Sequence, residues 1–291
     1  MGGWTVRSVL AWSVPWLKDR GVEAPRLDAE LLLASALGVR RLDLYLDPDR
    51  PLNADELGVF KPLLRRRGRR EPVAYILGRR SFWTLELEVV SGVLIPRPES
   101  EGVVEAVLDR FGDRSLALSI LDLGVGCGTL LLSLLSEYPE ARGTGVDLAP
   151  EPLECCARNG RRLGVMGRMR LFAGDLTDPL EDGERFDVIV CNPPYVGADE
   201  LAGLAPEVRD WEPRLALLGG DDGLAVIRRL LPRALGYLRA GGWLVVEIGA
   251  GQAEAVLALF REQGFDDVRV KNDYGGRPRV VTGQAPGGVV D

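Results

Sequence analysis

Apolar residues follow a helical spacing in the first part of the chain and form short, strand-like runs in the rest. Within residues 1–80 they recur three and four positions apart, which predicts four or five short helices. From Ser119 onward, short apolar runs alternate with longer amphipathic stretches. That alternation is typical of a parallel sheet covered by helices. The predicted fold class is therefore α/β, with a mostly parallel sheet and a separate N-terminal helical domain.

An alternating stretch separates these two regions. Residues 81–90 predict a strand, Ser91-Gly92 a turn and residues 93–95 a return strand, so a β-hairpin is expected to join the domains. Residues 279–282 predict an antiparallel edge strand. The expected organisation is a helical domain at 1–80, the hairpin linker at 81–97, the main α/β domain at 98–284 and a disordered tail at 285–291.

A glycine-rich loop follows the first buried run, residues 119–123. Alternate glycines allow a tight turn and let the backbone approach a ligand closely. The spacing differs from the dinucleotide fingerprint because the third glycine comes one residue early, which favours a smaller ligand such as a methionine moiety. The loop consists of Gly124, Val125, Gly126, Cys127 and Gly128.

Acidic residues follow the next two predicted strands. Asp147 ends the strand that starts at Gly143, about twenty residues past the loop, a spacing that suits a carboxylate binding ribose hydroxyls. Asp175 and Leu176 follow the strand at 169–173, where a side chain can meet an adenine edge. Ligands of open α/β sheets bind at the carboxyl ends of strands, so these residues predict one cofactor site.

The most informative motif is Asn192-Pro193-Pro194-Tyr195, which follows the buried run at 186–191. The two prolines restrict the backbone and hold Asn192 in an extended conformation. Neither proline has an N–H group, which favours free carbonyls at Asn192 and Pro193. An amide oxygen, a free carbonyl and an aromatic ring form a neutral pocket for a planar NH2 group. A carboxamide and the exocyclic amine of a base both fit that description.

Together, the glycine loop, the two acidic residues and Asn192 resemble the class I S-adenosylmethionine-dependent methyltransferases. The resemblance implies a Rossmann-like sheet, S-adenosyl-L-methionine as cofactor and S-adenosyl-L-homocysteine as product. A more specific resemblance, in order over nearly the whole chain, is to the peptide chain release factor N5-glutamine methyltransferases of the PrmC/HemK type. It rests on residues 26–32, 71–78, 82–83, 94–101 (Leu-Ile-Pro-Arg-Pro-Glu-Ser-Glu), 212–213, 216–217, 219–220, 222–224 and 273–276.

This resemblance implies methyl transfer to the side-chain nitrogen of the Gln in the Gly-Gly-Gln motif of a class 1 release factor, docked in part by the N-terminal helices. Two positions depart from the family pattern, since Ser100 and Val125 stand where Thr is usual. Implied cofactor-binding residues are Gly124, Val125, Gly126, Cys127, Gly128, Asp147, Asp175, Leu176 and Asn192. Implied catalytic residues are Asn192, Pro193 and Tyr195, and implied substrate-binding residues are Asn192, Pro193, Pro194 and Tyr195.

Composition narrows the function classes further. The chain has no histidine, which excludes His-based triads and His-ligated metal sites, and no metal is expected. Its four cysteines form no C-x-x-C pair, as expected for reduced thiols in a cytoplasmic protein. No apolar stretch is long enough to span a membrane, and the N-terminus shows no secretory signal. We therefore expect a cytoplasmic, monomeric enzyme.

Charge is distributed unevenly. Residues 1–80 carry 15 basic and 10 acidic side chains, whereas the remainder carries 21 basic and 33 acidic ones. The arginine run at 65–70 predicts either a patch that faces an acidic protein or RNA, or a solvated helix end. The acidic catalytic region argues against stable DNA binding.

Three alternatives remain open from the sequence. The first is glutamine methylation of a ribosomal protein, and the second is N6-adenine or N4-cytosine methylation of DNA, because the Asn192 motif suits those amines equally well. The third is a catalytically idle adaptor that binds a release factor. The sequence also leaves open recruitment to a secondary-metabolite peptide.

Overall fold

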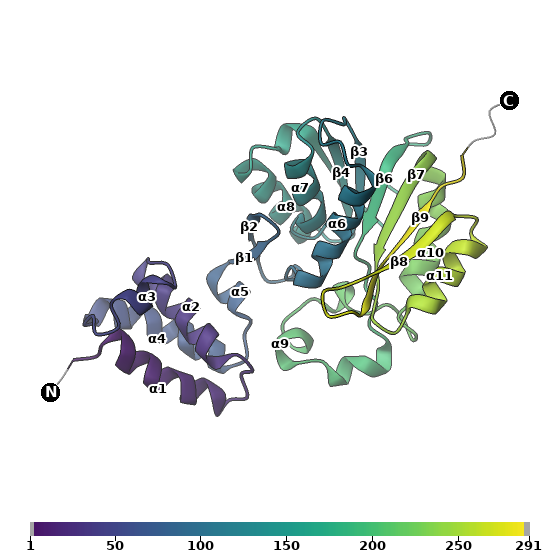
Figure 1. Ribbon diagram of the computed structural model, residues 1–291. Coiled ribbons are helices and arrows are strands. Elements are labelled where there is room, and N and C mark those ends of the chain that lie inside the picture. The colour runs from purple at the N-terminus through teal and green to yellow at the C-terminus, as the bar shows by residue number, and fades with distance from the viewer. Residues whose placement is uncertain (1–2, 288–291) are drawn as a thin grey trace. The chain divides into compact units, whose positions relative to one another are not determined.

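The computed structural model describes residues 3–287, which fall into two compact units (Figure 1). The helical unit comprises the chain up to Arg79 together with Ala205–Trp211. The sheet unit comprises Arg80–Leu204 and the chain from Glu212 onward. The sequence did not predict that residues 205–211 belong to the helical unit.

The helical unit packs its amphipathic helices around a core of buried aliphatic side chains. Asn53 caps α4, since its side chain accepts from Glu56 N–H while the Glu56 carboxylate accepts from Asn53 N–H, both at 2.9 Å. Gly38 ends α2 in the left-handed conformation, at a φ of 64°. The helices are α1 Val6–Lys18, α2 Pro25–Leu37, α3 Asp43–Leu46, α4 Ala54–Gly68, α5 Val73–Leu77 and α9 Pro206–Arg209.

A buried cluster of ion pairs lies inside the helical unit. Arg67 donates to Asp28 at 2.7 Å and to Glu207 at 2.7 Å, and Arg70 binds the same Glu207 carboxylate through two nitrogens at 2.6 Å each. Arg66 pairs with Glu71. Three arginines of the 65–70 run are therefore engaged within the unit, so the run is not simply a solvated helix end.

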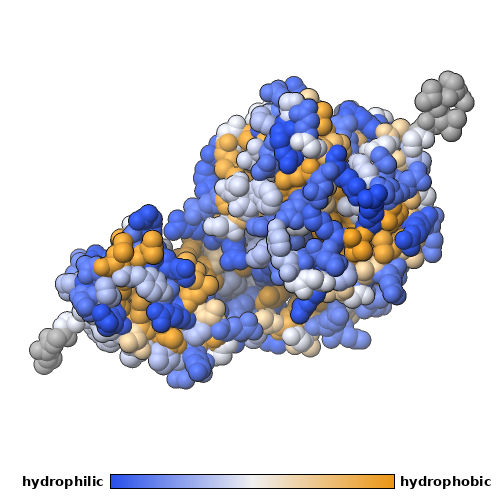
Figure 2. All heavy atoms as spheres, in the orientation of Figure 1, coloured by the Kyte–Doolittle hydropathy of each residue, from blue (hydrophilic) through white to orange (hydrophobic). Residues whose placement is uncertain are grey.

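The helical unit also leaves large apolar side chains at its surface. Figure 2 shows apolar surface between the polar side chains of this unit. The Trp12 and Trp16 rings stack at 5.9 Å between centroids, and Trp4 meets Trp12 edge-on. Exposed apolar residues of the unit include Trp4, Trp12, Leu42, Tyr45 and Leu46. Within residues 3–287, every helix is too short or too polar to cross a bilayer.

The sheet unit is built on a seven-stranded sheet with the order β5-β4-β3-β6-β7-β9-β8. Neighbouring strands from β5 to β7 are parallel, and β9 is antiparallel to both β7 and β8. The predicted α/β class is thereby confirmed. The strands are β3 Ser119–Leu123, β4 Arg142–Asp147, β5 Met169–Ala173, β6 Phe186–Cys191, β7 Leu238–Glu247, β8 Asp266–Asn272 and β9 Pro278–Gln284.

Helices cover both faces of this sheet (Figure 1). The helices α6, α7 and α8 pack on one face, and α10 and α11 pack on the other. The central strands are almost fully buried as a result, which explains their continuous apolar runs. The helices are α6 Glu101–Arg110, α7 Thr129–Glu137, α8 Pro150–Arg162, α10 Ala225–Tyr237 and α11 Ala253–Glu262.

The β-hairpin is present, but the predicted turn was wrong. The strands are β1 Arg79–Phe82 and β2 Leu85–Glu88, so the chain reverses at Trp83-Thr84 and residues 93–95 form no strand. Trp83 has a positive φ of 53°. Its backbone N–H donates to Glu101 at 3.1 Å and its indole N–H to Glu137 at 2.7 Å, so distant carboxylates hold this turn.

The predicted antiparallel strand is present, but it is the second strand from the edge of the sheet and not the edge strand itself. Residues 279–282 belong to β9, and β8 pairs outside it to form the edge. Ala285, the first residue of the predicted tail, is buried, and it exchanges backbone hydrogen bonds with Gly241 and Gly242. Residues 288–291 lie outside the described part of the chain.

We predict that Arg67→Ala lowers the free energy of unfolding by roughly 3–5 kcal/mol, because it leaves the buried Asp28 carboxylate without its cation and leaves Glu207 with Arg70 alone. Arg69→Ala is the matched control, since Arg69 is exposed and its loss should change stability by about 0.5 kcal/mol or less. Chemical denaturation followed by tryptophan fluorescence measures both. Similar small losses in the two variants would contradict a structural role for the cluster.

Candidate active site

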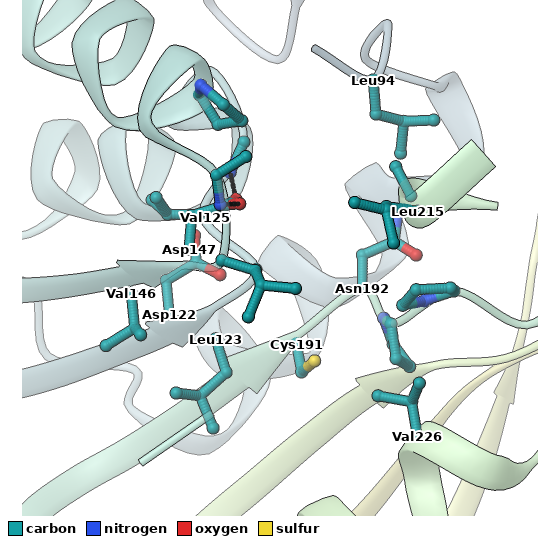
Figure 3. Close-up of a pocket in the computed structure, with 18 of the residues that line it drawn as sticks. Leu94, Asp122, Leu123, Val125, Val146, Asp147, Cys191, Asn192, Leu215 and Val226 are labelled. Atoms are coloured by element: carbon teal, nitrogen blue, oxygen red, sulfur yellow. Dashed lines mark hydrogen bonds between the residues drawn. The ribbon is translucent and has the colours of Figure 1, made fainter. Parts of the chain in front are cut away.

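A cavity of about 330 Å³ opens at the carboxyl ends of β3, β4 and β6 (Figure 3). Strand β3 pairs with β4 on one side and with β6 on the other, so the residues that follow these three strands meet there. In Figure 3, Asp122, Val125 and Asp147 lie on one side of the cavity, and Asn192 and Leu215 lie across from them. The fold thus brings the predicted cofactor loop and the predicted catalytic motif to one site.

The glycine loop has the backbone conformation that its sequence predicts. Gly124 and Gly126 line the cavity with positive φ values of 81° and 56°. The loop is anchored to β4, because the N–H groups of Gly124 and Val125 donate to the Val146 carbonyl at 2.8 and 3.0 Å. A side chain on Gly124 would place its Cβ 3.9 Å from the Asn192 carbonyl oxygen. The loop therefore leaves its backbone open toward the cavity.

The last two residues of the loop, Cys127 and Gly128, pack against the protein interior. Cys127 and Gly128 are outside the set of described residues that line the cavity. A Cβ on Gly128 would lie 2.5 Å from Leu132 Cδ1 and 2.9 Å from Cys156 Sγ. Burial raises the pKa of the Cys127 thiol to about 12, so it stays protonated and unreactive.

Asp147 links the loop to the end of β4. One carboxylate oxygen accepts from Gly126 N–H at 3.0 Å, and the other accepts from Ala149 N–H at 3.2 Å. Burial raises the pKa of Asp147, and the backbone hydrogen bond from Gly126 is the largest opposing effect. The carboxylate lines the cavity beside the loop, as the sequence predicts for a group that binds hydroxyls.

Asp175 and Leu176 also line the cavity, at the end of β5. The Asp175 carboxylate is paired with Arg229 of α10, and its carbonyl accepts from Arg233 at 3.3 Å. Leu176 has a positive φ of 52°, an unusual conformation for a leucine, and it packs against the core. These contacts fix the loop after β5 against α10.

Asn192 lines the cavity, and its side-chain amide forms a hydrogen bond with a neighbouring residue. Its Nδ2 donates to Ser100 Oγ at 3.2 Å, so Oδ1 is the end of the amide that stays free of this contact. Pro193 and Pro194 line the cavity as well, and Pro193 is buried. Among residues 3–287, no hydrogen bond to the Pro193 carbonyl is present. Two acceptors are thus available at adjacent residues.

Tyr195, the last residue of the motif, is held by contacts with β7 and the segment that follows it. It is not among the described residues that line the cavity, and its hydroxyl donates to Glu247 Oε1 at 3.5 Å. Its carbonyl accepts from the Gln252 side chain at 3.0 Å. Burial raises the pKa of the Tyr195 hydroxyl to about 12, so it remains protonated.

Asp122 is a cavity residue that the sequence analysis missed. It is 1% exposed, and one carboxylate oxygen accepts from Leu131 N–H at 3.1 Å, while the other has no hydrogen-bond partner in the described part of the chain. Burial raises its pKa to about 7. The signal in the sequence was an acidic residue inside the apolar run of β3, two residues before Gly124.

A second missed feature closes the cavity on the Asn192 side. Glu212 is buried, pairs with Arg97 and accepts from Ile95 N–H at 3.2 Å. Burial raises the pKa of Glu212, which Arg97 opposes. Arg97 and Ile95 both line the cavity, as do Pro213 and Leu215 just after Glu212. This pair joins the two segments, near 95–97 and 212–215, that form this wall.

The fold and the site define a class I methyltransferase. A family model described as a methyltransferase domain matches residues 120–211. A methyltransferase structure from Pyrococcus furiosus is similar in fold, with a TM-score of 0.53 at 18% identity, covering 71% of this chain and 91% of that one. No group of three or more metal-ligating side chains is present among residues 3–287.

The particular family follows from closer relatives. The model of the PrmC N-terminal domain matches residues 8–78. A release factor glutamine methyltransferase of Geobacter sulfurreducens is 46% identical over 281 residues, 97% of each chain. The Caulobacter vibrioides protein of the same name is 45% identical over 281 residues, 96% of each chain. The chain belongs to the release factor glutamine methyltransferase family, and the resemblance found in the sequence is confirmed.

We predict that Gly128→Ala is more destabilising than Gly126→Ala, although both residues have positive φ values. Strain at a left-handed position costs roughly 1–2 kcal/mol in each variant. Only Gly128→Ala adds overpacking, at roughly 1–3 kcal/mol more, because nothing lies within 4 Å of a Cβ on Gly126. Urea denaturation of the ligand-free variants measures the free energy of unfolding of each. Equal losses of stability in the two variants would show that close packing is not the reason for glycine at position 128.

Proposed function

We propose that this protein transfers a methyl group from S-adenosyl-L-methionine to the side-chain nitrogen (N5) of the Gln in the Gly-Gly-Gln motif of a class 1 peptide chain release factor. The observation that supports this most directly is the Asn192 amide, whose Oδ1 stays free while Nδ2 is bound to Ser100. An acceptor beside a buried cavity suits a carboxamide NH2 group. The names of the relatives favour a release factor over a ribosomal protein.

The residues present fit the proposed cofactor. The open backbone of Gly124 and Gly126 accommodates a ligand close to the main chain. Asp147 is proposed to bind the ribose hydroxyls, and Asp175 with Leu176 to lie at the adenine. The unpartnered oxygen of Asp122 adds an acceptor to the same wall. Carboxylates on this side also suit a cationic sulfonium group. S-adenosyl-L-methionine supplies a methyl group activated by that sulfonium.

The opposite wall is proposed to hold the substrate amide. Asn192 Oδ1 and the Pro193 carbonyl each accept one N–H of the glutamine NH2 group, which orients its nitrogen. Both acceptors also stabilise the positive charge that develops on nitrogen during methylation. Pro194 supports the rigid turn, and Tyr195 is the proposed aromatic neighbour of the amide plane. After transfer, the extra proton is lost to water, so no histidine base is required.

The helical unit is proposed to help dock the release factor. It corresponds to the matched PrmC N-terminal domain, and its exposed side chains include Trp12, Leu46, Arg65 and Arg69. Apolar and cationic side chains on one unit suit a protein partner with acidic surface. The acidic composition of the sheet unit argues against stable DNA binding, and a monomer is proposed.

The direct test is to incubate the enzyme with a purified class 1 release factor and S-adenosyl-L-methionine. Peptide mass spectrometry should find the mass of one added CH2 group on the Gln of the Gly-Gly-Gln motif. A release factor with that Gln replaced by Ala serves as the control and should gain no mass. Modification of a ribosomal protein or of DNA instead would overturn the proposal.

We predict that Asn192→Ala and Asp147→Ala impair different steps, methyl transfer in the first variant and cofactor binding in the second. Loss of the Asn192 acceptor should lower kcat by about 10²- to 10³-fold with little change in cofactor affinity, as for removal of one preorganised polar group. Loss of Asp147 should mainly weaken cofactor binding, because it removes the ribose acceptor and the anchor of Gly126. Steady-state kinetics and calorimetry with S-adenosyl-L-homocysteine separate the two. A near-normal kcat for Asn192→Ala would contradict its role.

A further inference from the structure

One exposed leucine belongs to the active-site cavity. Leu215 is 72% exposed, yet it is also one of the residues that line the cavity. Single exposed leucines are ordinary on protein surfaces. A leucine that is this exposed and also lines a cavity lies at the cavity mouth. Figure 3 shows Leu94, Leu215 and Asn192 on the same side of the cavity, across from Val125.

The turn that carries Leu215 is fixed to the segment that follows the Asn-Pro-Pro-Tyr motif. Leu215 is the middle residue of the short 3-10 helix Arg214–Ala216. Just after this helix, the Leu217 carbonyl accepts from Val196 N–H at 2.9 Å. The Val196 carbonyl in turn accepts from Gly219 N–H, also at 2.9 Å. Leu215 is therefore presented by an anchored turn and not by a free loop.

The residue before this turn fixes it on the other side. Glu212 accepts from Ile95 N–H at 3.2 Å and pairs with Arg97. Leu94 directly precedes Ile95, so the same contacts keep Leu94 next to the turn of Leu215. Arg97 also lines the cavity, but its guanidinium is engaged by Glu212. The apolar residues that line the cavity in these two segments are Leu94, Ile95, Pro96, Pro213, Leu215 and Ala216.

We propose that Leu94 and Leu215 form an apolar rim that binds the peptide segment next to the target Gln, and that Leu215 selects for glycine in that segment. The inference rests on the proposed methylation of a glutamine amide. A Gln side chain is short, so a Gln that reaches Asn192 brings its own backbone to the cavity mouth. The neighbouring backbone then lies against the apolar rim.

This placement explains why glycine beside the Gln would be favoured. Glycine has no Cβ, so its backbone can approach another surface closely. Substrate binding would then bury the exposed Leu215 side chain, which is favourable because apolar surface leaves water. A side chain on the residue before the Gln would meet Leu215 and displace the Gln from Asn192. Such a substrate would lose the alignment that methyl transfer requires.

The rim is tested first by the affinity for substrate. Leu215→Ala should raise the KM for the release factor by about tenfold with little change in kcat, because it removes most of the apolar surface that the substrate covers. Leu116→Ala is the matched control, since Leu116 is an exposed leucine of the sheet unit outside the set of described residues that line the cavity. Its KM should equal that of the wild type.

Calorimetry with S-adenosyl-L-homocysteine shows whether the effect is confined to the substrate. Both variants should bind this ligand as the wild type does, which also shows that they are folded. A normal KM in Leu215→Ala would overturn the inference. An equal loss of affinity for S-adenosyl-L-homocysteine would overturn it as well, because Leu215 would then belong to the cofactor side.

Selectivity is tested with a release factor in which the Gly directly before the Gln is replaced by Ala. The wild-type enzyme should use this substrate with a kcat/KM about tenfold lower or less, as expected for one extra carbon in a fitted apolar site. In Leu215→Ala the ratio of kcat/KM for the altered substrate to that for the normal one should rise. In Leu116→Ala the ratio should stay at the wild-type value. An unchanged ratio in Leu215→Ala would refute the selection for glycine.

These outcomes are separable from failure of the proposed function. If the wild-type enzyme transfers no methyl group to the release factor, the proposed function fails. If it does, and Leu215→Ala keeps the wild-type KM and the wild-type ratio, the inference alone fails.

Discussion

The site depends on the parallel pairing of β3 with both β4 and β6. In that register Leu123 lies beside Val146 on one side and Cys191 on the other, so the loop after β3 emerges between Asp147 and Asn192. The small residues of β4 make this possible. A Cβ on Gly145 would lie 2.9 Å from Val125 Cγ2, and one on Gly143 would lie 2.6 Å from Leu131 Cδ1. Glycines in this strand thus leave room for the glycine loop and the helix that follows it, although glycine weakens strands in general.

Much of the fold was predictable because each central strand is buried on both faces. Such strands are continuous apolar runs, and the predicted runs at 119–123 and 186–191 match β3 and β6. The predicted run at 169–173 matches β5, an edge strand that is only partly buried. The motifs at their ends could then be assigned to one edge of the sheet. The hairpin turn could not be located in this way, because Trp83 adopts a left-handed conformation through contacts with Glu101 and Glu137, which are distant in sequence.

The same limit applies to the carboxylates around the site. The sequence marks the position of Glu212, through the family resemblance, and of Asp122, near the glycine loop, but it does not show their contacts. The partners of these two residues and of Glu247 are brought together by folding. Glu212, for example, meets Arg97 and the backbone of Ile95 across more than a hundred residues of sequence. Sequence reasoning found the residues that recur at strand ends. It missed the buried carboxylates that contact the segments around the cavity.

Asp122 and Glu247 share a property that a stable core avoids. Each is nearly or fully buried, and each has one oxygen without a hydrogen-bond partner among the described residues. Burying a carboxylate in this way destabilises a fold, and an apolar residue would pack there at lower cost. Local rules of stability are commonly broken at functional sites. Asp122 lies near the end of β3 and Glu247 at the end of β7, and these two strands pair with β6 on either side. Their burial therefore points to the same edge of the sheet as the candidate active site, independently of any sequence signature.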